Sequence, residues 1–576
     1  MKKAKRRAVG FLSLLLALAM TLSGCQSGTG ESSASKAEDS KASESSKAEE
    51  SKETESTEKE AEREDKPESD IPNFNPTGYP ICDDPVTLKV MCNVGPLAPS
   101  DFNDIMIVQR AEEVTNVHID WLMVPGTGWD EKKNLMLATG DLPDIIESQL
   151  AVSDLTRYGP DGSFIPMQDL ISEYAVNFTH LYEELPDLER YIVAPDGNTY
   201  GMARVNSGPW MTTNGVGTIN TAWLDAVGMD MPETLDDFYE VLKAFKEKDP
   251  NGNGVADEIP FDFAMGSKSP LTENNGVGYI MASFGIAVGT GDHTYTGVKD
   301  GEVICQGTLP EYKEAVTYLT KLYQEGLMSV EGFTSTNADL IAKLNQDPAV
   351  IGYVQLWDIN DYVSNPENND AMAYMPILKH ADGREPRFYR NPMPGINRGW
   401  DTITSACETP EVAIRWIDYF FEETISIEHI EGPIGVRLIE QPDGTLHVRE
   451  APEGMTVADD RAAHCNAQTL AVTPSMYEKR LKLPHTDPKV EFVEEYCHPF
   501  ADPEPMMPVY YTAEESNEMA QLQTDIQTFI DRKTSEWMRN GNIDAEWDNY
   551  IKELNSMGLD RWLEIKQEAY DRFMAS

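Results

Sequence analysis

Strand-like and helix-like hydrophobic patterns alternate along the first part of the body of the chain. They follow one another in the order Val86–Val94, Asp104–Thr115, His118–Val124, Trp129–Thr139 and Asp144–Glu147. The first, third and fifth segments have the pattern of short strands, and the two between them repeat apolar residues at helical spacing. This β-α-β-α-β order predicts a mainly parallel sheet with right-handed crossovers. Ligands bind beyond the carboxyl ends of strands in such sheets, so Glu147 and Ser148 are candidate ligand-binding residues.

Helical patterns dominate the rest of the chain. The predicted helices are Leu235–Lys248, Leu309–Glu325, Asp339–Asn345 and Pro410–Phe421, followed by a helical run, Asp525–Met574, that is broken near Gly541 and Gly558. Thr234 precedes the first of these helices and Asp237 follows three residues later, which is typical of a helix N-cap. Together the two regions predict an α/β protein.

An apolar run of about a dozen residues, Phe11–Leu22, follows a basic cluster at the N-terminus. It is too short to cross a bilayer, and no later stretch reaches the length of about 20 apolar residues that a membrane helix needs. The next residues, Leu22-Ser23-Gly24-Cys25, resemble the bacterial lipobox, whose cysteine is acylated and becomes the N-terminus after cleavage. We expect residues 1–24 to be a lipoprotein signal peptide. Cys25 would then hold the protein on the outer face of the cell membrane through its lipid. An ordinary secretory signal with a chance cysteine is the alternative.

Residues 26–70 consist almost only of Ser, Glu, Lys, Ala, Thr and Asp and contain no aromatic residue. Such a segment cannot bury enough apolar surface to offset the entropy lost on ordering. We therefore interpret residues 25–79 as a lipid-anchored, disordered linker.

The chain is strongly acidic, with a formal net charge of −51 at pH 7. A field of this sign repels nucleic acid and anionic lipid headgroups, so we expect no nucleic-acid partner. It also disfavours a polyanionic ligand, unless a local basic pocket exists.

Six cysteines follow Cys25 without CxxC or Cys/His metal spacing. An extracellular location permits disulfides, and Cys82 and Cys92 are near enough in sequence to pair. Free thiols agree equally well with the sequence.

Several motifs recur in one family and in the same order. They are Ala138–Ile145 (ATGDLPDI), Trp223–Gly228 (WLDAVG) with Pro232–Phe238 (PETLDDF), Lys243–Pro260 (KAFKEKDPNGNGVADEIP), Glu311–Ala315 (EYKEA) with Leu322–Leu327 (LYQEGL), and Glu546–Tyr550 (EWDNY) with Gln567–Arg572 (QEAYDR). Over residues 85–576 the chain resembles the family 1 extracellular solute-binding proteins of bacterial ABC sugar importers. The likeness is greatest to the group of long lipoproteins that includes alginate-oligosaccharide-binding members.

The resemblance implies a two-lobe periplasmic-binding-protein-like fold (type II), with a hinge and an interlobe cleft. Lobe 1 would comprise residues 80–215 with about 375–440, and lobe 2 residues 216–374 with about 441–576. The chain would cross the hinge near Gly215–Asn220 and again near Tyr374–Leu378. The implied function is capture of a carbohydrate, most simply an oligosaccharide, by closure of the lobes, followed by delivery to the permease subunits of an ABC transporter.

The loop Asp249–Glu258 has the spacing of a calcium site. Side-chain oxygens fall at positions 1, 3, 5, 9 and 10 and a glycine at position 6, as in the first part of an EF-hand loop. The candidate ligands are Asp249, Asn251, Asn253, the Val255 carbonyl, Asp257 and Glu258. Pro260 stands at position 12, where an EF-hand has a bidentate Glu, so Asp257 or Glu258 must complete the shell. A solvated Asn-Gly turn is the alternative to a structural calcium ion.

Sugar sites combine stacked aromatic rings with carboxylates, amides and Arg. Trp210 stands in a loop before the first hinge crossing, Trp357 with Asp358 follows an apolar strand, and Trp400 lies where the resemblance places a ligand aromatic. Tyr279, in a Gly-rich stretch, is a further candidate, and each of these aromatics could instead be a packing residue. A uronate ligand would require one of four arginines in the cleft: Arg204, Arg387, Arg390 or Arg398.

Two other classes of protein compete with an importer receptor. A glycoside hydrolase would need paired carboxylates, but 98 acidic residues make any such pair uninformative, and no GxSxG, HExxH or P-loop motif is present. We therefore expect no enzyme activity. A peptide-binding or sensory surface lipoprotein is the other alternative. An aromatic-rich cleft would favour sugars, whereas a cleft with Asp and Arg placed to bind chain termini would favour peptides.

Overall fold

The computed structural model describes residues 71–576, except residues 96, 214, 266–270, 272–275, 290, 453–454, 456, 484–486 and 576. The predicted signal peptide, the predicted acylation site Cys25 and most of the predicted linker lie outside the described residues. Residues 71–79 of that linker are described, and Phe74 among them is buried in the hydrophobic core. The described residues belong to one compact unit of the chain, residues 64–576.

A six-stranded sheet forms around the first predicted strands. Its order is β14-β4-β11-β3-β1-β2, with β1 at Val86–Val94, β2 at Val117–Pro125, β3 at Ile145–Glu147, β4 at Met202–Asn206, β11 at Ile396–Ile403 and β14 at Ala471–Val472. β1 pairs in parallel with β2 and β3, as the β-α-β-α-β order predicts. β11 runs antiparallel between β3 and β4, so a strand from much later in the chain enters the middle of this sheet.

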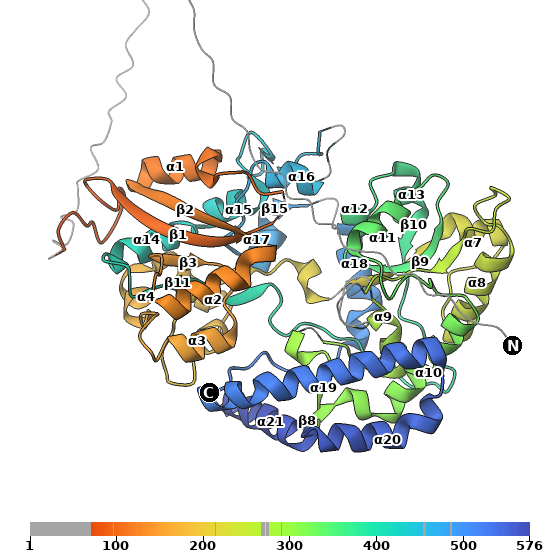
Figure 1. Ribbon diagram of the computed structural model, residues 1–576. Helices are drawn as coiled ribbons and strands as arrows, with labels where there is room; N and C mark the ends of the chain where they lie inside the picture. The colour runs from red at the N-terminus through yellow and green to blue at the C-terminus, as the bar shows by residue number, and fades with distance from the viewer. Residues whose placement is uncertain are drawn as a thin grey trace, which may run out of the picture. The chain divides into compact units, whose positions relative to one another are not determined.

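Helices cover both faces of this sheet because the side chains of β1 alternate between them. Cys92 packs in a cluster with Ile107 and Val108 of α1, Met106–Thr115. Met91 belongs to a different cluster, with Met136 of α2, Trp129–Thr139. Figure 1 accordingly shows α1 on one side of β1 and β2 and α2 on the other. Four shorter helices follow: α3 at Val152–Tyr158, α4 at Gln168–Tyr174, α5 at Val176–Glu184 and α6 at Leu188–Ile192.

A second, four-stranded sheet has the order β10-β5-β9-β6. Its strands are β5 at Val216–Asn220, β6 at Ile259–Phe261, β9 at Ile351–Leu356 and β10 at Met372–Tyr374. The helices between them are α7 at Thr221–Val227, α8 at Leu235–Glu247, α9 at Gly278–Met281, α10 at Pro310–Gln324, α11 at Asn337–Leu344, α12 at Ile359–Tyr362 and α13 at Pro366–Ala371, with a hairpin of β7, Thr296–Lys299, and β8, Glu302–Cys305. The predicted N-cap of α8 is confirmed, since the Thr234 hydroxyl accepts from the Asp237 amide and the Asp237 carboxylate accepts from the Thr234 amide.

The part of the chain after residue 403 contributes to both regions. Its elements are α14 at Pro410–Tyr419, α15 at Glu423–Glu431, α16 at Val457–Ala462, α17 at Pro474–Lys479 and α18 at Asp487–Tyr496, with a three-stranded sheet of β12, Leu438–Glu440, β13, Leu446–Val448, and β15, Leu481–Lys482. The C-terminal helices are α19 at Ala513–Asn540, α20 at Ile543–Ser556 and α21 at Leu559–Ala575, which confirms the predicted breaks near Gly541 and Gly558. β14 pairs with β4, whereas α19 packs along α10 (Figure 1). The lobe limits given above stay a prediction.

The six cysteines that follow the linker are free thiols: Cys82, Cys92, Cys305, Cys407, Cys465 and Cys497. Burial raises the pKa of each one. Since the thiolate is the reactive form, these side chains act as packing residues.

Candidate functional site

Trp400 stands on an irregular stretch of β11. The register between β11 and β4 shifts between Asn397 and Asp401, and Gly399 adopts a left-handed conformation with φ of 65°. The Ser148 amide donates to the Trp400 carbonyl at 2.8 Å, so this stretch is fixed to the loop that follows β3. The Trp400 side chain is half-buried, and its indole nitrogen is buried without a hydrogen-bond partner among the described residues. Two predicted ligand-binding residues, Ser148 and Trp400, therefore lie next to each other.

Arg204 of β4 covers the ring of Trp400. Its guanidinium carbon lies 5.1 Å from the ring centroid, and its Nε donates to the Ala467 carbonyl at 3.1 Å. Burial lowers the pKa of Arg204 to about 10, so the side chain keeps its charge at neutral pH. When ionised, the Asp401 carboxylate also attracts Arg204.

Glu147 and Asp401 form a fully buried carboxyl pair beside Trp400. They face each other as register partners of β3 and β11, and both are 0% exposed. The Thr469 hydroxyl oxygen lies 2.6 Å from Glu147 Oε1 and 2.6 Å from Asp401 Oδ1. Burial raises the pKa of Glu147 to about 7, and burial together with the charge of Glu147 raises the pKa of Asp401 well above its usual range. The predicted contact of Glu147 with a ligand stays a prediction, and in this structure its partner is Thr469.

Trp210 lies in a 3₁₀ turn, Pro209–Thr212, directly after β4. Its half-buried ring meets Tyr477 of α17 edge to face, with the ring centroids 4.6 Å apart. The Tyr477 hydroxyl donates to Asn206 Oδ1 at 2.6 Å. β4 carries both Arg204, which covers Trp400, and Asn206, which binds the Tyr477 hydroxyl beside Trp210. This strand therefore connects the surroundings of Trp400 with those of Trp210.

Trp357 and Asp358 follow β9, at the end of the second sheet. Asp358 caps α12, its Oδ1 accepting from the Asn360 amide at 2.9 Å. The half-buried Trp357 ring has the Lys489 ammonium 4.0 Å from its centroid. Lys489 belongs to α18, which also packs against the turn that carries Trp210. Helix α18 thus connects the Trp357 group with the Trp210 group.

Tyr279 packs in the core of the second sheet. It is 3% exposed, and its hydroxyl donates to the Met375 carbonyl at 2.6 Å. The small cavity beside it, about 20 Å³, has room for little more than one water molecule. A direct contact between Tyr279 and a sugar stays a prediction.

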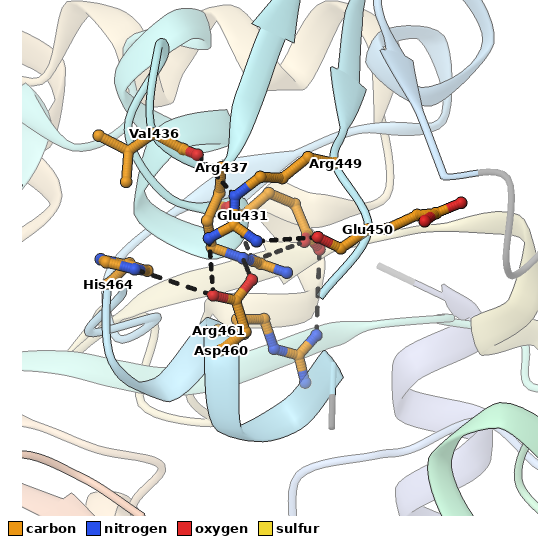
Figure 2. A network of polar contacts seen from close by, with 8 residues as sticks. All are labelled: Glu431, Val436, Arg437, Arg449, Glu450, Asp460, Arg461 and His464. Carbon is orange, nitrogen blue, oxygen red and sulfur yellow. Dashed lines mark hydrogen bonds and ion pairs between the residues drawn. The ribbon is translucent and has the colours of Figure 1, made fainter. Parts of the chain in front are cut away.

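Figure 2 shows a network of polar contacts around Asp460. Asp460 accepts from Arg437 Nε at 2.7 Å and from Arg449 Nη2 at 2.8 Å, and Arg437 Nη1 also donates to the Glu431 carbonyl at 2.7 Å. Arg437 and Asp460 are each 1% exposed. Because removal of one member of a buried ion pair is strongly destabilising, this network fixes α15, α16 and the β12–β13 hairpin in place.

The loop between α8 and β6 has the geometry of a turn rich in oxygen atoms. Gly254, at position 6, has φ of 74°, and its amide donates to Asp249 Oδ2 at 3.0 Å. The Val255 amide donates to Asn253 Oδ1 at 2.6 Å. Burial, and repulsion from Asp249 and Asp257, raise the pKa of Glu258, whose Oε1 is buried without a hydrogen-bond partner in the described part of the chain. An unpartnered oxygen among carboxylates and amides fits a hard cation. No group of three or more His, Cys, Asp or Glu side chains placed to bind a metal occurs among the residues that the structure describes.

Several residues of these clusters had no clear signal in the sequence. Asp401, Thr469 and Tyr477 come close to the predicted residues only through tertiary contacts, and Lys489 is one of many charged residues on a helix. Arg204 was singled out only as a condition for an acidic ligand. By contrast, Arg387 pairs with Asp502, and Arg398 is buried between Tyr191 and Tyr510.

The chain resembles known proteins over most of its length. A family model described as bacterial extracellular solute-binding protein matches residues 104–424. The fructooligosaccharide ABC transporter substrate-binding protein FusA of Streptococcus pneumoniae serotype 4 is 34% identical over 509 residues, which cover 85% of this chain and 91% of that protein. Lipoprotein LipO of Bacillus subtilis is 32% identical over 248 residues, 42% of this chain and 45% of that protein.

Solved structures agree with this likeness. FusA in complex with kestose has a TM-score of 0.75 at 33% identity, covering 85% of this chain and all of that one. A FusA EF-hand mutant in complex with fructo-nystose has a TM-score of 0.75 at 32% identity and the same coverage. A solute-binding protein of Bifidobacterium longum infantis, at 23% identity and a TM-score of 0.76, supports the fold alone. Within the described residues, no helix has both the length and the apolar character needed to span a membrane.

Proposed function

Because the chain belongs to the bacterial extracellular solute-binding proteins, we propose that it captures an oligosaccharide outside the cell and passes it, chemically unchanged, to the permease subunits of an ABC transporter. The observation that carries this proposal is a pair of similar groups on two separate sheets. Trp400 with Arg204 stands on one, and Trp357 with Asp358 and Lys489 stands on the other. Trp400 Nε1, Asp358 Oδ2 and Lys489 Nζ are buried without hydrogen-bond partners among the described residues. Aromatic rings beside such polar atoms suit the apolar faces and hydroxyl rims of sugars.

The arrangement of the two sheets supports a hinge between two lobes. The chain leaves β4 of the first sheet and enters β5 of the second, and later leaves β10 of the second sheet and returns to β11 of the first. β5 and β10 are neighbours, with Thr218 opposite Tyr374, and the Met375 amide donates to the Gly217 carbonyl at 2.8 Å. The two connections therefore join neighbouring strands of one sheet, β4 and β11, to neighbouring strands of the other, β5 and β10, which agrees with a hinge made of two chain crossings.

A fructooligosaccharide is the first candidate for the ligand. FusA is named for that class of sugar, and its solved complexes contain kestose and fructo-nystose. The net charge of −51 agrees with an uncharged glycan. A peptide ligand or a sensory role for the same fold is the second candidate.

Isothermal titration calorimetry of the purified protein with kestose, fructo-nystose and a set of short peptides tests this function. We expect saturable binding of the sugars and recovery of the sugar unchanged. Trp400→Ala should weaken binding by about tenfold, the order of one lost ring contact, whereas Trp400→Phe should keep most of the affinity. Binding of peptides alone would support the second candidate, and shortened sugar products would contradict a pure binding role.

The Asp249–Glu258 loop is the proposed site of a structural calcium ion. Asp249, Asn251, Asn253, Asp257 and Glu258 would supply side-chain oxygens, and Val255 would supply its carbonyl. The unpartnered Glu258 oxygen supports this, as does the EF-hand named for FusA. Bound there, the ion would hold the connection between α8 and β6.

The proposed location is the outer face of the cell membrane, through acylation of Cys25. The family description as extracellular agrees with export. Cell fractionation tests the anchor, because Cys25→Ser should move the protein from the membrane fraction to the medium.

A further inference from the structure

Lys489 is a buried lysine with an incomplete set of contacts. Its side chain is 0% exposed, and its Nζ has no hydrogen-bond partner among the residues that the structure describes. The ring of Trp357, 4.0 Å away, covers one side of the ammonium. Burial lowers the pKa of Lys489 to about 8, so most of the molecules carry the charge at neutral pH. A buried ammonium without a hydrogen bond costs stability, and its retention needs a reason.

A second incomplete group stands beside the same ring. Asp358 Oδ1 is occupied by the cap of α12, but Oδ2 is buried and completes no hydrogen bond in the described part of the chain. Lys489 is attracted to Asp358, yet Lys489 Nζ and Asp358 Oδ2 are both buried without a hydrogen bond to each other. A buried lysine with a purely structural role would be expected to form an ion pair with the neighbouring carboxylate.

The missing contacts match the chemistry of a hydroxyl-rich ligand. The ring binds one side of the ammonium, so the N–H groups directed away from Trp357 are the ones that need an acceptor. A sugar hydroxyl can accept from Lys489 and donate to Asp358, which an apolar group cannot do. Asp358 already offsets the charge of the single ammonium, and two other titratable neighbours, Tyr374 and Cys497, have raised pKa values and are uncharged. A carboxylate on the ligand would add repulsion here.

We propose that Lys489 is a specificity-determining residue of the carbohydrate site, donating to an oxygen of a neutral glycan while Asp358 accepts from one of its hydroxyl groups. Trp357 then acts as a positioning residue, because its ring face carries the ammonium and not the sugar. This inference rests on the proposed function and deepens it. It reassigns Trp357 from a stacking platform to the support of a cation.

Calorimetry with kestose tests the role of Lys489. Lys489→Met should weaken binding by at least tenfold, while Lys552→Met, at an exposed lysine of α20, should leave it unchanged. The affinity of the wild-type protein should fall as the pH rises through about 8, and Lys489→Arg, which stays charged, should bind kestose without that fall. Glu147, whose pKa is about 7, is present in both the wild type and Lys489→Arg, so its effect on affinity cancels when the two pH profiles are compared. Unchanged affinity in Lys489→Met, or equal pH profiles for the wild type and the arginine variant, would overturn the proposal.

Thermal unfolding without ligand tests separately whether Lys489 has a structural role. Lys489→Met should melt at the same temperature as the wild type or higher, because it removes a buried charge that the fold does not use. A melting temperature lower by several degrees would assign Lys489 a structural role and overturn the proposal. If kestose fails to bind the wild type, the proposed ligand is wrong, and this melting comparison still decides the role of Lys489.

Discussion

Thr469 has one hydroxyl proton but two carboxyl neighbours at 2.6 Å. Glu147 Oε1 also accepts from the Thr469 amide at 3.1 Å, which favours Glu147 as the acceptor of the hydroxyl proton. The hydroxyl oxygen can then be close to Asp401 only if Asp401 is protonated and donates to it. The raised pKa of Asp401, caused by burial and by the charge of Glu147, agrees with this order of donors. The pair therefore holds a proton at neutral pH, directly beside Trp400.

Replacing Asp401 with Asn should remove much of the pH dependence of stability. In the unfolded chain both carboxyls ionise near pH 4, whereas the folded pKa of Glu147 is about 7 and that of Asp401 is also raised. The folded state thus binds more protons than the unfolded state above pH 4, and stability falls as the pH rises toward 7. Asp401→Asn keeps a donor to Thr469 but cannot ionise. Its melting temperature relative to the wild type should increase by a few degrees between pH 4.5 and 7.5 in scanning calorimetry.

Thr469→Val is the matched control for that comparison. It removes the bridge between the carboxyls and should lower the melting temperature at every pH in this range, because it leaves buried oxygens without a donor. A constant difference between Asp401→Asn and the wild type across the range would show that the pair holds no extra proton.

Single residues of the site were predictable from sequence only where the local context was unusual. Trp357 could be singled out because it directly follows an apolar strand, and Trp400 because the family resemblance places a ligand aromatic there. Lys489 could not, because a lysine on a polar helix has the same local pattern whether it is solvated or buried. Its role depends on a contact with Trp357, more than one hundred residues earlier in the chain.

Helices and strands with strong local signals were predicted closely. α2 spans the predicted Trp129–Thr139, and β1 spans the predicted Val86–Val94. The short helices α3 to α6 and the inserted strand β11 were not predicted. Helices of five to nine residues show too few turns to establish a period, and the place of β11 depends on pairing with β3 and β4 from a distant part of the chain.

At the scale of an element, removal of calcium should loosen the connection between α8 and β6. Asp249, Asp257 and Glu258 repel one another without a cation, and the raised pKa of Glu258 reflects burial and this repulsion. Bound calcium should raise the melting temperature by mass action, so EDTA should lower it by several degrees and added calcium should restore it. Asp257→Asn should reduce the effect of EDTA. Equal melting curves with EDTA and with calcium would contradict the site.

For the whole molecule, the proposed function requires that one ligand contact both sheets. The Trp400 group belongs to the six-stranded sheet, and the Trp357 group stands at the end of the four-stranded sheet. A ligand shifts a conformational equilibrium only by its difference in affinity for the two states, so closure depends on simultaneous contact with both groups.

Small-angle X-ray scattering should therefore show a smaller radius of gyration when the protein is saturated with kestose. Trp400→Ala and Lys489→Met should each lose this compaction at a sugar concentration that saturates the wild type, because each removes contact with one sheet. At higher concentrations, where a variant is again saturated, its compaction should remain incomplete, since the lost contact is the one that favours the closed state. Equal compaction of the wild type and both variants at full saturation would show that closure does not depend on the two groups acting together on one ligand.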